Sequence, residues 1–157
     1  DVAELSYAQR RKVGCVVVKD NQIVSFGYNG TPSGFDNICE HEHVAIVEVD
    51  GGYEKNPEAI KALEDDGYFC NANGVCGKVT HETKREVLHA ESNAITKIAK
   101  STLSSDGADL YTTTTPCFEC SKLIIQSGIK RVFYTEDYRD MTGQNLLASA
   151  NIEVIKI

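Results

Sequence analysis

TTTTPCFEC, residues 112–120, joins a run of threonines to a proline and two cysteines. Threonine is β-branched and suits the pleated surface of a sheet, so the run predicts a strand. Pro116 ends that strand and can occupy the first position of a helix, where no backbone N–H is needed. On such a helix Cys117 and Cys120 lie on one face, because helical residues three apart are neighbours. The pair could bind a metal, exchange disulfides or only pack.

The segments that follow and precede this stretch alternate between helical and strand patterns. Apolar side chains recur at helical spacing between Ala90 and Ile98, whereas the strand segments are short and rich in β-branched and aromatic residues. This alternation predicts an α/β fold whose sheet has parallel neighbours and helices on its faces. The expected helices are residues 89–101, 117–128 and 141–150, and the expected strands are residues 109–115, 130–136 and 152–157.

The N-terminal part of the chain predicts a hairpin of two strands. The apolar run VGCVVVK, residues 13–19, indicates a buried strand, and residues 23–30 indicate its returning partner. Asp-Asn-Gln at residues 20–22 supplies the turn. Residues 4–11 have the pattern of a helix end, and the composition of residues 31–37, TPSGFDN, indicates a loop.

Residues 40–85 fit no regular pattern except at one short stretch. PEAIKALEDDG, residues 57–67, has proline at its start and glycine at its end, which predicts a helix. A long loop within a compact domain is usually functional or held in place by something. We therefore expect a single domain, residues 1–157, with an irregular insertion at about residues 40–85.

The composition is that of a globular protein without a polynucleotide or membrane partner. Its 41% hydrophobic and 25% charged residues are ordinary values. A net charge of −7 counts against binding to a polynucleotide, which requires clustered Lys and Arg. No apolar run approaches the roughly eighteen residues of a membrane span, and the first residues lack the apolar core of a signal peptide. We expect a cytoplasmic protein in a reducing compartment, where cysteine pairs near histidines indicate a metal more often than a disulfide.

A second motif, VLHAESNAI at residues 87–95, supplies a histidine and a glutamate. His89 and Glu91 can serve one site if His89 caps the helix, because helical residues two apart point in different directions. One imidazole and two thiolates make three zinc ligands and leave a fourth position open for water. Zinc lowers the pKa of that water, and a nearby carboxylate such as Glu91 can move its proton. The combination suits attack on an amidine-like ring carbon with loss of ammonia.

LHAE and PCFEC match the HxE and PCxxC motifs of the zinc-dependent cytidine and deoxycytidylate deaminases. The strings RRKVGCVVVKDNQIVSFGYNGTPSG, LYTTTTPCFEC and SGIKRVFYTEDY resemble deoxycytidylate (dCMP) deaminases, above all those of phages. GYNGTPSG, residues 27–34, favours these over cytidine, guanine or tRNA-adenosine deaminases. The resemblance covers the chain except for about residues 40–84. It implies a three-layer α/β/α fold of the cytidine deaminase type, with a five-stranded mixed sheet and helices on both faces.

The same resemblance implies the site and its reaction. The reaction would be hydrolytic deamination of dCMP to dUMP and ammonia, which supplies dUMP for dTMP synthesis. Zinc would be held by His89, Cys117 and Cys120, with Glu91 as the proton shuttle, whereas a purely structural zinc site would normally have four protein ligands. The residues implied to contact the substrate are Asn29, Ala90 through its backbone, Thr115, Pro116 and Tyr138. Asn29 could instead be only a turn residue, and Tyr138 only a packing residue.

Regulation and assembly are also implied by the resemblance. Family members are commonly homo-hexamers that dCTP activates and dTTP inhibits, with magnesium accompanying the effector, through a site near the GYNG loop. In this chain Asn29, Arg10, Arg11 and Lys12 would then meet the triphosphate. The alternative is that the RRK run is only the solvated end of a helix.

A second, structural zinc is expected in the irregular segment, as in some phage relatives. Four soft ligands would hold a long loop that buries little apolar surface. His41 or His43 could replace one of them, and free, reduced thiols are the alternative. The expected ligands are Cys39, Cys70, Cys76 and His81.

Other functions remain open at this stage. The same chemistry could act on cytidine-type substrates such as deoxycytidine, on dCTP, or on both dCMP and dCTP. A nucleotide-sensing module without catalysis could keep zinc for structure, although Glu91 would then have no role. In a thiol-redox protein built on Cys117 and Cys120, both His89 and Glu91 would be idle.

Overall fold

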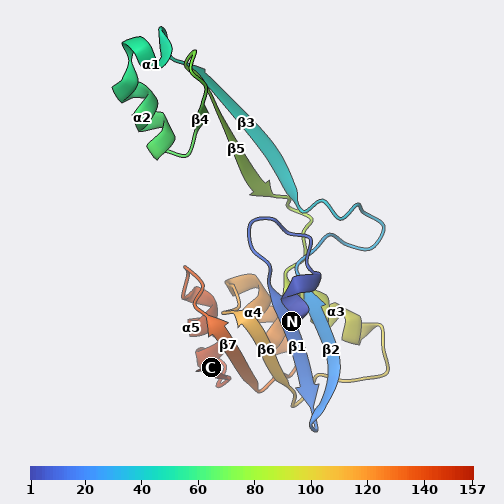
Figure 1. Cartoon of the computed structure of the whole chain (residues 1–157). Coiled ribbons are helices and arrows are strands. Elements are labelled where there is room, and N and C mark those ends of the chain that lie inside the picture. Colours follow the sequence, from blue (N-terminus) through green and yellow to red (C-terminus); the bar gives the residue numbers. More distant parts are fainter. The chain divides into compact units, whose positions relative to one another are not determined.

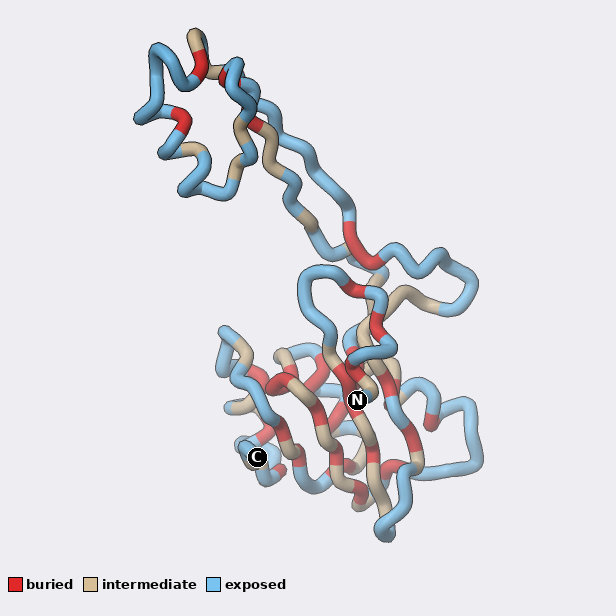
Figure 2. The backbone as a smooth tube through the Cα atoms, in the orientation of Figure 1, coloured by how far each residue is buried: buried red, intermediate tan, exposed pale blue.

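The computed structural model describes all residues from Asp1 to Ile157 and divides the chain into two compact units (Figures 1 and 2). The larger unit contains Asp1–Cys39 and Arg85–Ile157, and the smaller unit is Glu40–Lys84. The smaller unit coincides with the insertion expected at residues 40–85. Each unit has a sheet of its own, so the two are described separately.

The sheet of the larger unit has five strands and mixed directions. Its strands are β1 (Gly14–Lys19), β2 (Gln22–Tyr28), β6 (Asp109–Thr114), β7 (Arg131–Glu136) and β8 (Glu153–Lys156). They lie in the order β2-β1-β6-β7-β8 (Figure 1). β1 is antiparallel to β2 and β6, whereas β6, β7 and β8 are parallel to their neighbours. The predicted α/β fold with a five-stranded mixed sheet is confirmed.

Three α-helices pack on one face of this sheet. They are α3 (Ala90–Ala99), α4 (Phe118–Gln126) and α5 (Thr142–Ser149). The opposite face carries the short 3-10 helix η1 (Val2–Leu5), since a Cβ on Gly14 would lie 2.5 Å from the Ala3 nitrogen. None of the helices combines the length and hydrophobicity that crossing a bilayer requires. The buried core between sheet and helices includes Cys15, Val17, Leu110 and Val132 of the strands and Ala94, Ile124 and Leu147 of the helices.

α3 approaches β2 unusually closely, and a glycine makes this possible. A Cβ on Gly27 would lie 2.2 Å from the Ala90 carbonyl oxygen and 2.5 Å from the Ala94 nitrogen. The Ser25 hydroxyl also donates a hydrogen bond of 2.8 Å to the Ala94 carbonyl oxygen. These contacts fix the first turns of α3 against the sheet.

Two local expectations differ from the structure. Pro116 was expected at the first position of a helix, but α4 begins at Phe118 with Cys117 as its N-cap. The Thr115 N–H, just before Pro116, still pairs with the Glu136 carbonyl oxygen at 2.9 Å. The helix end expected at residues 4–11 is reduced to η1, and the Asn29 side chain hydrogen-bonds the backbone of Arg11 and Val13 instead.

The smaller unit is a sheet with two helices, and its strands were not predicted from the sequence. It contains β3 (Glu40–Glu48), α1 (Gly52–Lys55), α2 (Pro57–Asp65), β4 (Phe69–Cys70) and β5 (Val75–Thr83). The antiparallel strands lie in the order β3-β5-β4, and α2 confirms the predicted helix. Almost every residue of β3 is exposed (Figure 2). Its sequence therefore lacks the alternation of apolar and polar residues that identifies a half-buried strand.

Truncation of a core leucine tests the packing of the larger unit. Leu110 in β6 is fully buried, so Leu110→Ala leaves a cavity and should lower the free energy of unfolding by about 2–5 kcal/mol. Leu103→Ala is the matched control, since Leu103 is 51% exposed and its loss should change stability by no more than about 0.5 kcal/mol. Urea unfolding followed by circular dichroism measures both, and equal losses would contradict the assigned core.

Candidate active site

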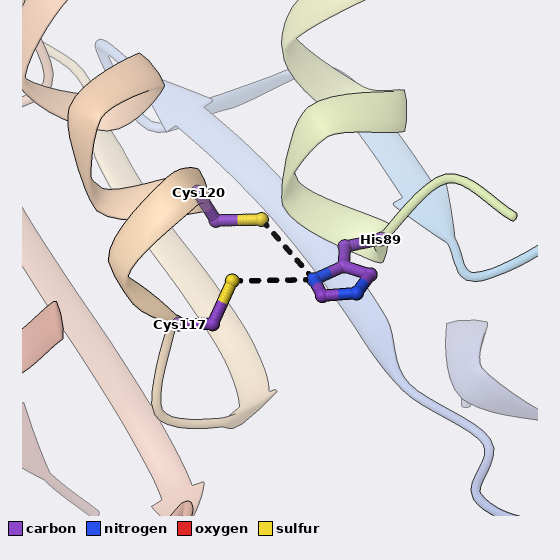
Figure 3. Close-up of side chains that lie close together, drawn as sticks. All are labelled: His89, Cys117 and Cys120. Atoms are coloured by element: carbon purple, nitrogen blue, oxygen red, sulfur yellow. Dashed lines mark hydrogen bonds between the residues drawn. The ribbon is translucent and has the colours of Figure 1, made fainter. Parts of the chain in front are cut away.

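Three soft donors converge where α3 and α4 begin (Figure 3). The His89 Nδ1 atom lies 3.3 Å from the Cys117 sulfur and 3.5 Å from the Cys120 sulfur. The three candidate ligand atoms all lie within 4.8 Å of one another. The structure thus brings together the three residues that the sequence proposed as metal ligands.

Each ligand comes from the start of a helix. His89 is the N-cap of α3 and has an extended backbone, with φ −72° and ψ 157°. Cys117 is the N-cap of α4, and Cys120 lies in the first turn of that helix. Neither cap side chain bonds its own helix, so both remain available for other partners. The partial positive charge at a helix N-terminus favours thiolate and carboxylate groups there.

The donor set fits zinc. Imidazole and thiolates are ligands that zinc prefers, and three protein ligands are typical of a catalytic rather than a structural zinc. His89 is exposed, Cys117 is partly buried and Cys120 is buried, so one side of the group is open to solvent. A bound ion would thus have three protein ligands and an accessible side.

The site favours negative charge on Cys117. The pKa of the Cys117 thiol is lowered to about 4, chiefly by a hydrogen bond from Cys120 and further by one from His89. The hydrogen bond between Cys120 and Cys117 raises the pKa of the Cys120 thiol. The hydrogen bond between His89 and Cys117 raises the pKa of the His89 imidazole. A thiolate beside two further donors is suited to a cation.

Glu91 lies beside these ligands in the first turn of α3. Its side chain is 4% exposed, and burial is the main cause of the raised pKa of its carboxyl. The carboxyl also interacts with His89, Cys117 and Cys120. A buried carboxyl with a raised pKa next to a metal site can hold and transfer a proton.

Three of the predicted substrate residues, Ala90, Thr115 and Pro116, are close to the ligands in the sequence, whereas Tyr138 follows β7. Ala90 is fully buried at the start of α3, next to Gly27. Thr115 is buried and donates two hydrogen bonds to the Glu136 carbonyl oxygen, one from its N–H and one from its hydroxyl. Pro116 is also buried, whereas Tyr138 is partly exposed, with the Arg139 guanidinium 5.8 Å from its ring centre. Their contacts with a substrate stay predictions.

Asn29 has a clear structural role. Its side-chain oxygen accepts a hydrogen bond of 2.8 Å from the Val13 N–H, and its amide group donates one of 2.8 Å to the Arg11 carbonyl oxygen. Its own carbonyl oxygen accepts a bond of 2.6 Å from the Ser6 hydroxyl. Asn29 therefore joins the start of β1 to the end of β2, and its predicted contact with sugar or phosphate stays a prediction.

Two residues beside the site, Cys15 and Ser121, were not predicted from the sequence. Cys15 of β1 is fully buried, and the charge of Glu91 contributes to its raised pKa after burial itself. Ser121 donates to the Cys117 carbonyl oxygen at 2.9 Å. The apolar run around Cys15 indicated only a core strand, because no local pattern relates residue 15 to residue 91. Ser121 follows Cys117 by four residues, and that helical spacing was the one available signal.

The structure does not assemble the predicted second zinc site. Cys70 and Cys76 are directly opposite each other on β4 and β5 and form a disulfide. Sulfurs joined in this way cannot act as thiolate ligands, which removes two of the four expected donors. Of the other two, Cys39 belongs to the larger unit and His81 to the smaller one. The expectation of a second zinc on Cys39, Cys70, Cys76 and His81 is therefore wrong for this structure.

Comparisons with known proteins agree on one family. A family model described as "Cytidine and deoxycytidylate deaminase zinc-binding region" matches residues 1–136. The deoxycytidylate deaminase of enterobacteria phage T4 is 35% identical over 159 residues, which cover 93% of this chain and 79% of the phage protein. That of Mycobacterium phage D29 is 33% identical over 86% of each chain. The crystal structure of the dCMP deaminase from the cyanophage S-TIM5 in complex with dCMP and dUMP has a TM-score of 0.72 and 36% identity, over 99% of this chain and 88% of that chain.

Metal analysis tests the site. We expect about one zinc per chain in purified protein, and about none in Cys117→Ala, because two remaining protein ligands do not retain zinc. The matched control is the double variant Cys70→Ser, Cys76→Ser, which should keep the zinc content of the unmodified chain. Mass spectrometry of the metal content measures all three. A second zinc that disappears in the control variant would restore the rejected site.

Proposed function

The chain belongs to the cytidine and deoxycytidylate deaminase family, and we propose that it hydrolyses dCMP to dUMP and ammonia. The main support is the convergence of His89, Cys117 and Cys120 beside the buried Glu91 carboxyl. The phage relatives support the substrate, since the S-TIM5 enzyme was crystallised with dCMP and dUMP. The product dUMP would serve dTMP synthesis.

Each residue of the site has a separate role in the proposed reaction. His89, Cys117 and Cys120 would hold zinc, which when bound lowers the pKa of water so that a nucleophile is available at neutral pH. In our proposal the Glu91 carboxylate accepts a proton from the attacking water and delivers it to N3 of the cytosine ring. Glu91 then passes the second proton of that water to the leaving amino group, so that ammonia departs and a carbonyl remains at C4.

Burial of Glu91 suits this shuttle. The carboxyl is shielded from bulk water, which raises its pKa and lets it carry a proton between two acceptors. Its position in the first turn of α3 ties it to His89, the metal ligand two residues earlier. Contact of the ring with the Ala90 backbone, and of the nucleotide with Thr115, Pro116, Tyr138 and Asn29, belongs to the same proposal.

Replacement of the shuttle tests the mechanism. Glu91→Gln removes the proton acceptor but keeps the shape of the side chain, so zinc should be retained and kcat should fall by about 10²–10⁴-fold. Ammonia release from dCMP measures the rate. The matched control is Glu119→Gln in the same site region: Glu119 is exposed, pairs with Lys122 at 2.5 Å, and should turn over dCMP normally.

Three outcomes would contradict the proposal. Near-normal turnover by Glu91→Gln would reject Glu91 as the proton shuttle. Ammonia release from deoxycytidine or dCTP that equals or exceeds release from dCMP at the same concentration would reject dCMP as the specific substrate. Binding of nucleotides without ammonia release from any of them would identify a sensing module instead.

We propose regulation at a hollow beside the GYNG loop. A cavity of about 620 Å³ is lined by residues of this loop, by the rings of Tyr7 and Tyr28, and by Lys97 and Lys100 of α3 and its end. Aromatic rings and ammonium groups suit the base and phosphates of a nucleotide such as dCTP or dTTP, with magnesium on the phosphates. The cations first expected to meet the triphosphate, Arg10, Arg11 and Lys12, do not line this cavity, and Arg11 pairs with Glu136 at 2.5 Å.

The effector response tests this assignment. In initial-rate measurements with dCMP and magnesium, dCTP should activate and dTTP should inhibit the unmodified chain. Lys100→Ala removes a cation from the cavity wall and should raise the dCTP concentration needed for activation by about tenfold or more, since a hydrogen bond to a charged group typically contributes about 1.5–3 kcal/mol. An unchanged response would contradict the site. We also propose that the chain forms a homo-hexamer, which light scattering would show. The reaction would take place in the cytoplasm, or in the host cytoplasm if the chain is encoded by a phage.

A further inference from the structure

The first turn of α5 lies directly against the backbone that carries Cys117. A Cβ on Gly143 would lie 2.3 Å from the Pro116 carbonyl oxygen, and 2.7 and 2.9 Å from the carbonyl carbon and oxygen of Cys117. Real Cβ atoms essentially never approach other atoms to less than 3.0 Å. All three neighbours are backbone atoms, so no side-chain rotation could make room for a larger residue.

The Cys117 backbone has little freedom to move away from α5. Its carbonyl oxygen accepts two hydrogen bonds of 2.9 Å from Ser121, one from the N–H and one from the hydroxyl. On the other side of Pro116, the Thr115 N–H donates to the Glu136 carbonyl oxygen of β7 at 2.9 Å. A shift of Cys117 would lengthen these bonds, and it would carry the sulfur away from His89.

We propose that Gly143 is a positioning residue for the metal site. Its lack of a side chain lets α5 hold the Cys117 backbone where the sulfur meets the His89 imidazole and the Cys120 sulfur. The inference depends on the proposed zinc site, but not on the identity of the substrate. It gives α5, which contributes no ligand, a defined part in the chemistry of the site.

Local helix stability alone would favour alanine at this position. Gly143 lies within α5, and its φ is not positive, so an alanine could adopt the same backbone conformation. Glycine within a helix costs conformational entropy that alanine does not. The contact with Pro116 and Cys117, rather than the helix itself, therefore explains why a glycine suits this position.

The test compares metal binding by the whole chain and its Gly143→Ala variant. We expect about a 10- to 100-fold weaker zinc affinity in the variant, because residues that orient a ligand typically contribute that much. Competition with a chromogenic chelator measures the affinity. Cobalt(II) in place of zinc adds a second readout: displacement of Cys117 should weaken the sulfur-to-cobalt absorption band, a change that needs no enzymatic turnover.

Two control variants separate positioning from general stability. Gly77→Ala is the matched glycine control, since nothing lies within 4 Å of a Cβ there, and it should keep the zinc affinity and the cobalt spectrum. Leu147→Ala removes a fully buried side chain from the same helix and adds no atom near Cys117. It should lower the melting temperature, yet keep zinc affinity at temperatures well below the melt.

Each result of these measurements either supports or overturns the proposed role of Gly143. A folded Gly143→Ala chain with weak zinc binding and an altered cobalt spectrum supports the proposal. Unchanged metal binding overturns it, and so does an equal loss of affinity in Leu147→Ala. A Gly143→Ala chain that fails to fold while Leu147→Ala folds also overturns it, because the glycine would then serve the fold as a whole. An unmodified chain that binds neither metal would instead reject the proposed function.

Discussion

The meeting of two helix N-termini at one point is the constraint on which the rest of the larger unit depends. α3 supplies His89 and Glu91, and α4 supplies both sulfurs, so neither helix can shift without separating the donors. The sheet fixes both starts: β2 contacts α3 at Gly27, and the end of β6, which is paired with the end of β7, leads into α4. Two thiols and one imidazole within reach of one another form a donor set that is already assembled in the fold, so metal binding would add directly to its stability.

The sequence predicted those parts of the site that depend on local spacing. Local spacing pairs His89 with Glu91 and Cys117 with Cys120 at helix starts. The meeting of the two pairs was expected from the resemblance to the deaminase motifs, and the structure brings them together. The helices and strands after residue 88 were predictable because one buried face imposes a clear period. Contacts between distant segments had no such signal: the closeness of Cys15 to Glu91 and of Gly143 to Cys117 arises only when the sheet and helices assemble.

The failures have physical causes of the same kind. β3 and β5 are exposed along most of their length, and a strand without a buried face leaves no alternating pattern in the sequence. The pairing of Cys70 with Cys76 depends on the register between β4 and β5, which spacing alone does not reveal. The segment before β1 was expected to be helical, but after η1 its backbone hydrogen-bonds the side-chain amide of Asn29, a contact that the sequence does not reveal.

The smaller unit leaves and re-enters the larger one through the two strands of a single ladder. Glu40 is directly opposite Thr83, so the points of departure and return are neighbours in space. An appendage joined in this manner can be shortened, lengthened or exchanged by recombination without altering strand order or ligand placement in the catalytic body. A change in its length would thus leave the placement of the metal ligands unchanged.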